Sequence, residues 1–108
     1  MERNQKLHNA IGIAMKAGKL QSGDQAVEKL VRARRACLVL MDADVSFNTR
    51  EKYEWLCRNS QTQLLAVPEL GTAIGKPGRM LAAVTDNQLT NLVRKAAEAE
   101  DSDKGTRG

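Results

Sequence analysis

The 108-residue sequence predicts an α/β fold, a three-layer α/β/α sandwich built as a single domain. Two observations carry this prediction. Short, continuous apolar runs are typical of strands that are buried on both faces of a sheet. They alternate with longer segments whose apolar residues recur at helical spacing. The expected order is α-β-α-β-α-β-α-β-α, and strands that alternate with helices form a sheet with helices packed on its faces.

The first half of the chain supplies two helices and a central strand. A helix is expected over residues 3–17, where one apolar stripe recurs at helical spacing and Gly18 offers a C-cap. Residues 19–22 form a short link or a brief edge strand, and Gly23-Asp24 opens a second helix that ends in the basic run 32–35. The run "ACLVLM", residues 36–41, reads as a strand in the middle of the sheet.

The second half repeats this alternation. After the polar loop "DADVSFNT", a third helix is expected over 49–59, with Tyr53, Leu56 and Cys57 on its inner face. The remaining elements are a buried strand over 62–67, a short helix from Pro68 to near Gly75, a strand over 80–85, and a last helix capped by Asp86 or Asn87. We place the domain at residues 1–97 and expect 98–108 to be a charged, flexible tail.

Charge is distributed unevenly along the chain. The net charge is +4 and the pI is about 9.3. Because residues from Glu98 onward hold 4 acidic and 2 basic side chains, the preceding body holds 15 basic and 9 acidic ones, a net +6. This excess points modestly to a polyanionic partner. The polar N-terminus and the absence of an apolar run of about 18 residues predict a soluble, cytoplasmic protein that does not enter a membrane.

Residues that could support catalysis or metal binding are sparse. His8 is the only histidine, and it lies in the first helix without an evident nucleophile to activate. Cys37 and Cys57 are expected to be buried free thiols. Asp42 and Asp44 follow a buried strand, where they could bind a metal, but Asp44 is favoured as a brace for the loop. The sequence therefore predicts no enzyme activity, no cofactor and no metal.

The stretch "ELGTAIGKPGR", Glu69 to Arg79, holds three glycines and two cations. A phosphate-binding loop follows a strand and opens a helix. Here Gly71 lies inside the short helix, Gly75 ends it, and the loop leads into a strand. The stretch is either a plain C-cap and turn, or a flexible loop whose Lys76 and Arg79 contact an RNA backbone.

Two further features suggest a binding surface. The stretch "AGKLQSGDQAVEK" places Lys19 before the start of the second helix and Lys29 within it, and a helix N-terminus offers free N–H donors. The arginines of the run 32–35 either neutralise phosphates or simply form a solvated helix end. Trp55 stands beside the inner stripe of its helix, so it is either exposed, as an anchor for a partner or a base, or at the rim of the core.

Taken in order, "AGKLQSGDQAVEKLVR", "ACLVLMDADVSFNT" and "ELGTAIGK…AAVTD" resemble the ribosomal L7Ae family, whose members bind kink-turn RNA, and within it the small bacterial YlxQ-type members. The resemblance covers roughly Gln5 to Ala96. It implies an α/β/α sandwich around a mixed four-stranded sheet. It also implies that RNA binds at the start of the second helix and at the loop before the last strand.

The family motif at the second helix is Gly-x-Asn-Glu-x-x-Lys, which reads tandem sheared G·A pairs. Gly23 and Lys29 match it, whereas Gln25 replaces the asparagine and Ala26 replaces the glutamate. Kink-turn binders keep an apolar loop before the last strand, which packs on a flipped base. In this chain the loop is "KPGR", residues 76–79, and its cations favour contact with the RNA backbone.

The leading hypothesis is a non-enzymatic, ribosome-associated protein that binds structured, kink-turn-like RNA, with Gln25 as the candidate base reader. The candidate RNA-binding residues are Lys19, Gly23, Asp24, Gln25, Lys29, Arg32, Gly75, Lys76, Pro77, Gly78 and Arg79. One alternative is a protein–protein interaction module that uses Trp55 and the charged helix faces. Another is a partner that recruits substrate to an RNA-modifying enzyme such as a ribose methyltransferase.

Overall fold

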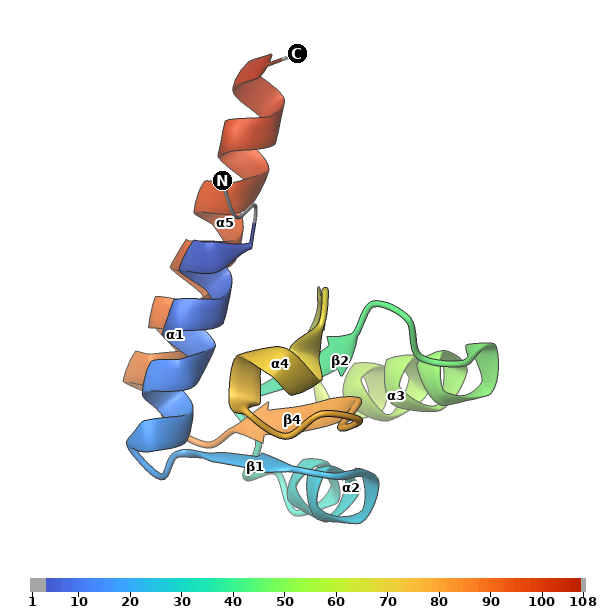
Figure 1. Cartoon of the computed structure of the whole chain (residues 1–108). Coiled ribbons are helices and arrows are strands. Elements are labelled where there is room, and N and C mark those ends of the chain that lie inside the picture. Colours follow the sequence, from blue (N-terminus) through green and yellow to red (C-terminus); the bar gives the residue numbers. More distant parts are fainter. Residues whose placement is uncertain (1–3, 108) are drawn as a thin grey trace.

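The computed structural model describes residues 4–107, with side chains for residues 4–100. Within this range the chain forms five helices and four strands (Figure 1). In chain order they are α1 (Gln5–Lys16), β1 (Leu20–Ser22), α2 (Asp24–Arg32), β2 (Leu38–Asp42), α3 (Phe47–Ser60), β3 (Gln63–Val67), α4 (Leu70–Ile74), β4 (Leu81–Val84) and α5 (Asn87–Arg107). The alternation of strands and helices that the sequence predicts is confirmed.

The four strands form one mixed sheet in the order β1-β4-β2-β3. β4 pairs antiparallel with both β1 and β2, whereas β2 and β3 are parallel. β2 and β4 occupy the centre, and all their residues are buried, as expected for continuous apolar runs.

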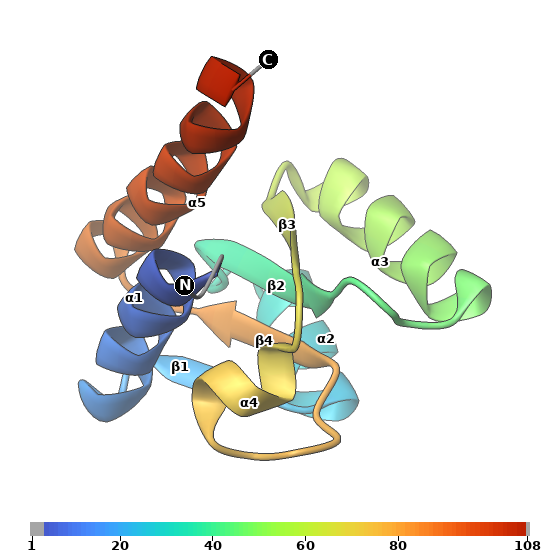
Figure 2. The ribbon, with the colours of Figure 1, turned by 45° about the horizontal axis from the view of Figure 1, so that its top comes forward.

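Side chains of alternating strand residues fill two cores, one on each face of the sheet. On one face, Leu38, Leu40 and Val84 pack with residues of α1, α4 and α5. On the other, Val39 and Met41 pack with residues of α2 and α3. Figures 1 and 2 show α1 and α5 together on one side of the sheet and α2 with α3 on the other. This arrangement is the predicted three-layer sandwich.

Three features differ from the sequence-based expectation. β3 is an edge strand whose Gln63 and Ala66 are exposed, so the prediction of a second strand buried on both faces is wrong. The residue that braces the loop after β2 is Asp42, not Asp44. The buried Asp42 carboxylate accepts hydrogen bonds from the backbone N–H of Asp44 at 2.9 Å and of Leu70 at 2.8 Å. Of the two thiols, Cys57 is buried, but Cys37 is only half-buried.

Helix α5 continues to Arg107, beyond Glu98, where the sequence suggested that the helix frays. Glu100 accepts hydrogen bonds from the backbone N–H groups of Lys6 and Leu7, at 3.1 and 3.4 Å. Helix α1 has no side-chain N-cap of its own, so a carboxylate of α5 serves its first turn. Figure 1 shows the far end of α5 on the opposite side of the molecule from α2. Independent motion of residues 98–108 stays a prediction.

Candidate nucleic-acid interface

The first turn of α2 starts at a backbone conformation that favours glycine. Gly23 has φ +107°, a region that side chains with a Cβ rarely adopt. Its N–H donates to the carbonyl of Leu81 at 2.9 Å, which ties the start of the helix to β4. No side chain caps the helix, so the N–H groups of its first turn, including that of the exposed Gln25, have no acceptor among the described residues.

The loop between α4 and β4 has a defined shape. Gly75 ends α4 with φ +70°, as the sequence predicts for a C-cap, and Lys76 N–H donates to the carbonyl of Gly71 at 2.9 Å. Gly71 is buried beneath this loop. A Cβ on it would lie 2.9 Å from the Lys76 carbonyl oxygen and 3.1 Å from the Gly78 nitrogen. The glycine at position 71 therefore lets the loop pack against α4.

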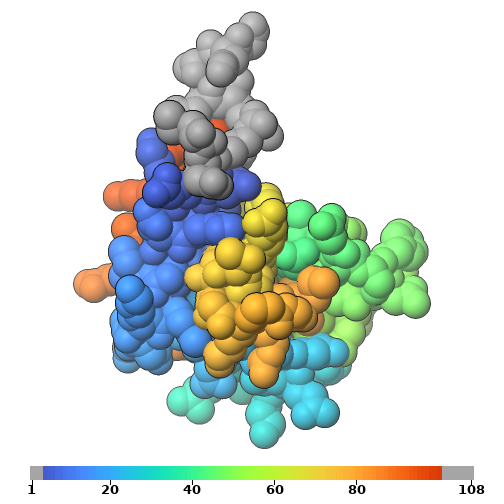
Figure 3. Space-filling view, in the orientation of Figure 1, coloured from blue at the N-terminus to red at the C-terminus, as the bar shows by residue number. Residues whose placement is uncertain are grey.

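Arg79 joins this loop to the start of α2. Its Nη1 donates to the carbonyl oxygen of Ser22 at 2.9 Å and contacts the Ser22 hydroxyl at 3.1 Å. A Cβ on Gly23 would lie 2.8 Å from the same nitrogen, so the glycine also makes room for the guanidinium. Figure 3 shows the loop, in orange, lying against the blue and cyan residues around the start of α2. Two segments that are far apart in sequence thus form one surface, which we call the α2–loop surface: Gly23, Gln25 and Lys29 from the start of α2, and residues 75–79.

Most of the predicted residues lie on this surface and are exposed. They are Gln25, Lys29, Gly75, Lys76, Pro77, Gly78 and Arg79, with Gly23 half-buried between them. Met80, which ends the loop, is also 42% exposed. Met80 could not be selected from the sequence, because it reads as the first residue of a buried strand.

Three predicted residues, Lys19, Arg32 and Asp24, have side chains that lie away from this surface. Lys19 immediately precedes β1, and its carbonyl accepts a hydrogen bond from Thr85 N–H at 2.9 Å. Thr85 follows β4 and the loop precedes β4, so Lys19 lies at the end of the sheet away from the loop. Arg32 lies at the other end of α2, about 12 Å along the helix from Asp24 at 1.5 Å per residue. There it pairs with Glu28 at 2.9 Å. Neither side chain is part of the α2–loop surface.

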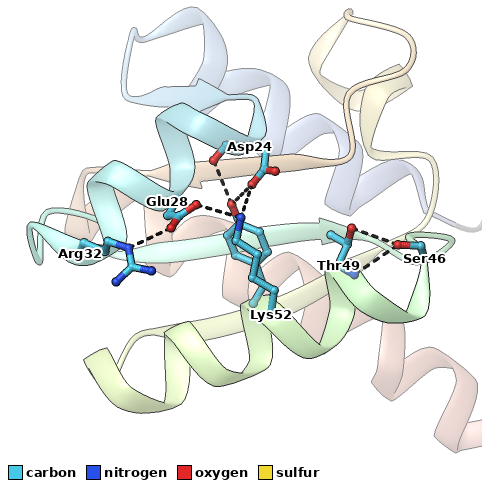
Figure 4. A network of polar contacts seen from close by, with 7 residues as sticks. Asp24, Glu28, Arg32, Ser46, Thr49 and Lys52 are labelled. Carbon is cyan, nitrogen blue, oxygen red and sulfur yellow. Dashed lines mark hydrogen bonds and ion pairs between the residues drawn. The ribbon is translucent and has the colours of Figure 1, made fainter.

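Asp24 faces α3 rather than the loop (Figure 4). The hydroxyl of the buried Tyr53 donates to the Asp24 carbonyl and to its carboxylate, and Lys52 pairs with the same carboxylate at 3.3 Å. Lys52 also pairs with Glu28 at 2.8 Å. These contacts lower the pKa of Glu28, mainly through Lys52, and raise the pKa of Lys52, mainly through Glu28. These contacts hold α2 against α3. Because Lys52 and Tyr53 belong to α3, the sequence of α2 alone does not indicate them.

Comparison with known proteins identifies the family. Residues 5–94 match the model of the Ribosomal protein L7Ae/L30e/S12e/Gadd45 family. The chain belongs to this family. It is 38% identical over 84 residues to the RNA-binding protein YlxQ of Bacillus subtilis (strain 168), covering 75% of this chain and 84% of that protein. It is 33% identical over 101 residues to the RNA-binding protein YlxQ of Enterococcus faecium, covering 87% of this chain and 93% of that protein. The resemblance to YlxQ-type members of the family is confirmed.

Solved structures agree on the fold. A Bacillus halodurans protein of unknown function superposes with a TM-score of 0.76 at 30% identity, over 89% of this chain and 97% of that one. The Giardia lamblia 15.5kD RNA binding protein superposes with a TM-score of 0.71 at 18% identity, over 94% and 90%. At that identity the second match supports the fold alone. Across residues 4–107, no helix is both long enough and apolar enough to cross a membrane.

Proposed function

We propose that this protein is a cytoplasmic, ribosome-associated RNA-binding protein without catalytic activity, and that it binds structured, kink-turn-like RNA through the α2–loop surface. The observation that carries the proposal is that Arg79 joins the loop 75–79 to Ser22, the residue that precedes Gly23 and the start of α2. Family membership and the names of the YlxQ relatives support RNA as the partner.

The chemistry of the surface fits a phosphate backbone. Lys29 and Lys76 are exposed, and neither makes an ion pair with another described residue. Both ammonium groups are therefore available to displace counterions from RNA. The N–H groups at the start of α2 that lack an acceptor add donors for phosphate or base edges. Gln25 is the proposed base reader, because its amide both donates and accepts hydrogen bonds.

Arg79 takes a different role in this proposal from that of the two lysines. Its guanidinium is engaged with Ser22, so it positions the loop against α2 and does not lead the contact with phosphates. Lys19 and Arg32 lie outside the α2–loop surface, and they are proposed to add only long-range attraction for the RNA.

The test is fluorescence anisotropy with a kink-turn RNA and with a control in which Watson–Crick pairs replace the tandem G·A pairs, each titrated across a salt series. Lys29→Ala and Lys76→Ala should each weaken binding and lower the salt slope by about 0.7 to 0.9, the share of one phosphate contact. Lys95→Ala, an exposed lysine on α5, is the matched control and should leave both quantities unchanged. Absence of binding to either RNA at low salt would refute RNA binding by this surface. Equal binding to both would refute kink-turn specificity alone.

A further inference from the structure

Helix α3 exposes an aromatic face that the fold does not use. Phe47 and Trp55 are 69% and 55% exposed, the two largest values among the large hydrophobic side chains that the structure describes. The inner face of the helix is already filled by Tyr53, Leu56 and Cys57, all buried. The chain contains three aromatic side chains of the Phe, Trp and Tyr types. Two of them therefore face solvent on one helix, although each could bury about 150–250 Å² in a contact.

These aromatic residues share one side of α3 with charged ones. Phe47, Glu51 and Trp55 are spaced four residues apart, so they lie along one side of the helix. Glu54 and Arg58 lie on the same side. We call these five residues the α3 face. Glu51, Glu54, Trp55 and Arg58 line an open hollow of about 320 Å³, a volume suited to the end of one or two long side chains. Figure 1 shows α3 on the far side of the molecule from α1 and α5.

The local charge of the α3 face opposes that of the whole chain. Among the described residues, Glu51 and Glu54 make no ion pair, and the nearby cations are directed elsewhere. Lys52 is held by Asp24 and Glu28, and Arg50 donates to the carbonyl of Ala43 at 3.1 Å. Two carboxylates against Arg58 leave a local negative charge beside an exposed indole, on a protein whose net charge is +4.

We propose that the α3 face binds an arginine-bearing segment of a partner protein. A guanidinium can stack on the indole of Trp55 and at the same time donate to a carboxylate of Glu51 or Glu54. Phe47 supplies apolar area beside this site. RNA is disfavoured here because the two carboxylates repel phosphates. The α3 face and the α2–loop surface share no residue, so the proposal does not depend on RNA binding.

The test uses the full chain and the N-terminally labelled peptide fluorescein-(Gly-Arg)₄-amide, with fluorescein-(Gly-Glu)₄-amide as the opposite-charge control. Trp55 is the only tryptophan, so its emission reports directly on the face. The arginine peptide should change that emission saturably, and the glutamate peptide should not. Glu51→Lys with Glu54→Lys should weaken binding of the arginine peptide about tenfold or more, measured by anisotropy.

A matched double variant separates the local site from the overall charge. Asp44→Lys with Glu98→Lys makes the same change in net charge at exposed carboxylates outside the α3 face, and it should keep binding within about twofold. Trp55→Ala should lose more affinity than Trp55→Phe, which keeps a ring. An equal loss in both double variants would overturn the proposal, as would an unchanged Trp55 emission. So would quenching of Trp55 by kink-turn RNA but not by the peptide, because the face would then belong to the RNA interface.

Discussion

Replacing Arg79 by alanine tests whether this side chain organises the RNA-binding surface or contacts RNA itself. The substitution removes two hydrogen bonds to Ser22. Because they lie at the surface, we expect a loss of about 1 kcal/mol in the free energy of unfolding. The loop keeps its bonds from Lys76 N–H to Gly71 and from Arg79 N–H to Lys76, so only one or two residues gain freedom. Ordering one residue again on binding costs about 1–2 kcal/mol, or about tenfold in RNA affinity.

The assay is RNA anisotropy at several salt concentrations, together with the thermal midpoint of the free protein. A positioning residue predicts weaker binding with an unchanged salt slope, since no phosphate contact is lost. Ser22→Ala, which removes one acceptor without changing the charge, should give a smaller loss with the same slope. Lys76→Ala should instead lower the slope. If Arg79→Ala lowered the slope as much as Lys76→Ala and left the thermal midpoint unchanged, Arg79 would be a phosphate contact and the positioning argument would fail.

Three further predictions address the loop, the base reader and the core. Gly71→Ala should lower the free energy of unfolding by about 1–3 kcal/mol and weaken RNA binding, because its Cβ would lie 2.9 Å from a loop carbonyl. Gly12→Ala, whose Cβ would have its nearest contact at 3.9 Å, should change neither the stability nor the RNA affinity. Ala26→Glu should raise the preference for kink-turn over control RNA by about tenfold, and an unchanged preference would rule out base reading at this position. Burial raises the pKa of Cys57 from 9.0 to about 11. The unfolded chain therefore loses this proton first, and thermal stability should fall as the pH rises from 9 to 11, less so in Cys57→Ala.

The fold could be predicted from local patterns because those patterns reflect burial. Tyr53, Leu56 and Cys57 recur at helical spacing and are buried on the inner side of α3 as expected. The edge position of β3 could not be predicted, because the apolar run "TQLLAV" does not specify how many neighbouring strands it has. The choice between Asp42 and Asp44 as the brace depends on which carboxylate faces α4, and the sequence alone does not fix that direction.

Part of the candidate site could also be predicted from local sequence patterns. Gly75 could be predicted because it ends a short helix, where a positive φ is common, and Gly23 because it opens a helix and matches the family motif. The bonds that assemble the surface join residues far apart in sequence. Arg79 and Ser22 are 57 positions apart, and Lys52 and Asp24 are 28 apart. Such contacts depend on the sheet order, so the engagement of Arg79 and the orientation of Asp24 toward α3 became visible only in the folded chain.

The most direct test of the RNA-binding surface is backbone amide NMR of the ¹⁵N-labelled protein during titration with kink-turn RNA. A surface formed by the start of α2 and the α4–β4 loop predicts that the largest shifts occur in residues 23–29 and 75–79, with small shifts in the exposed faces of α1, α5 and α3. Shifts concentrated on α3, or on α1 and α5, with residues 23–29 and 75–79 unchanged, would contradict the account.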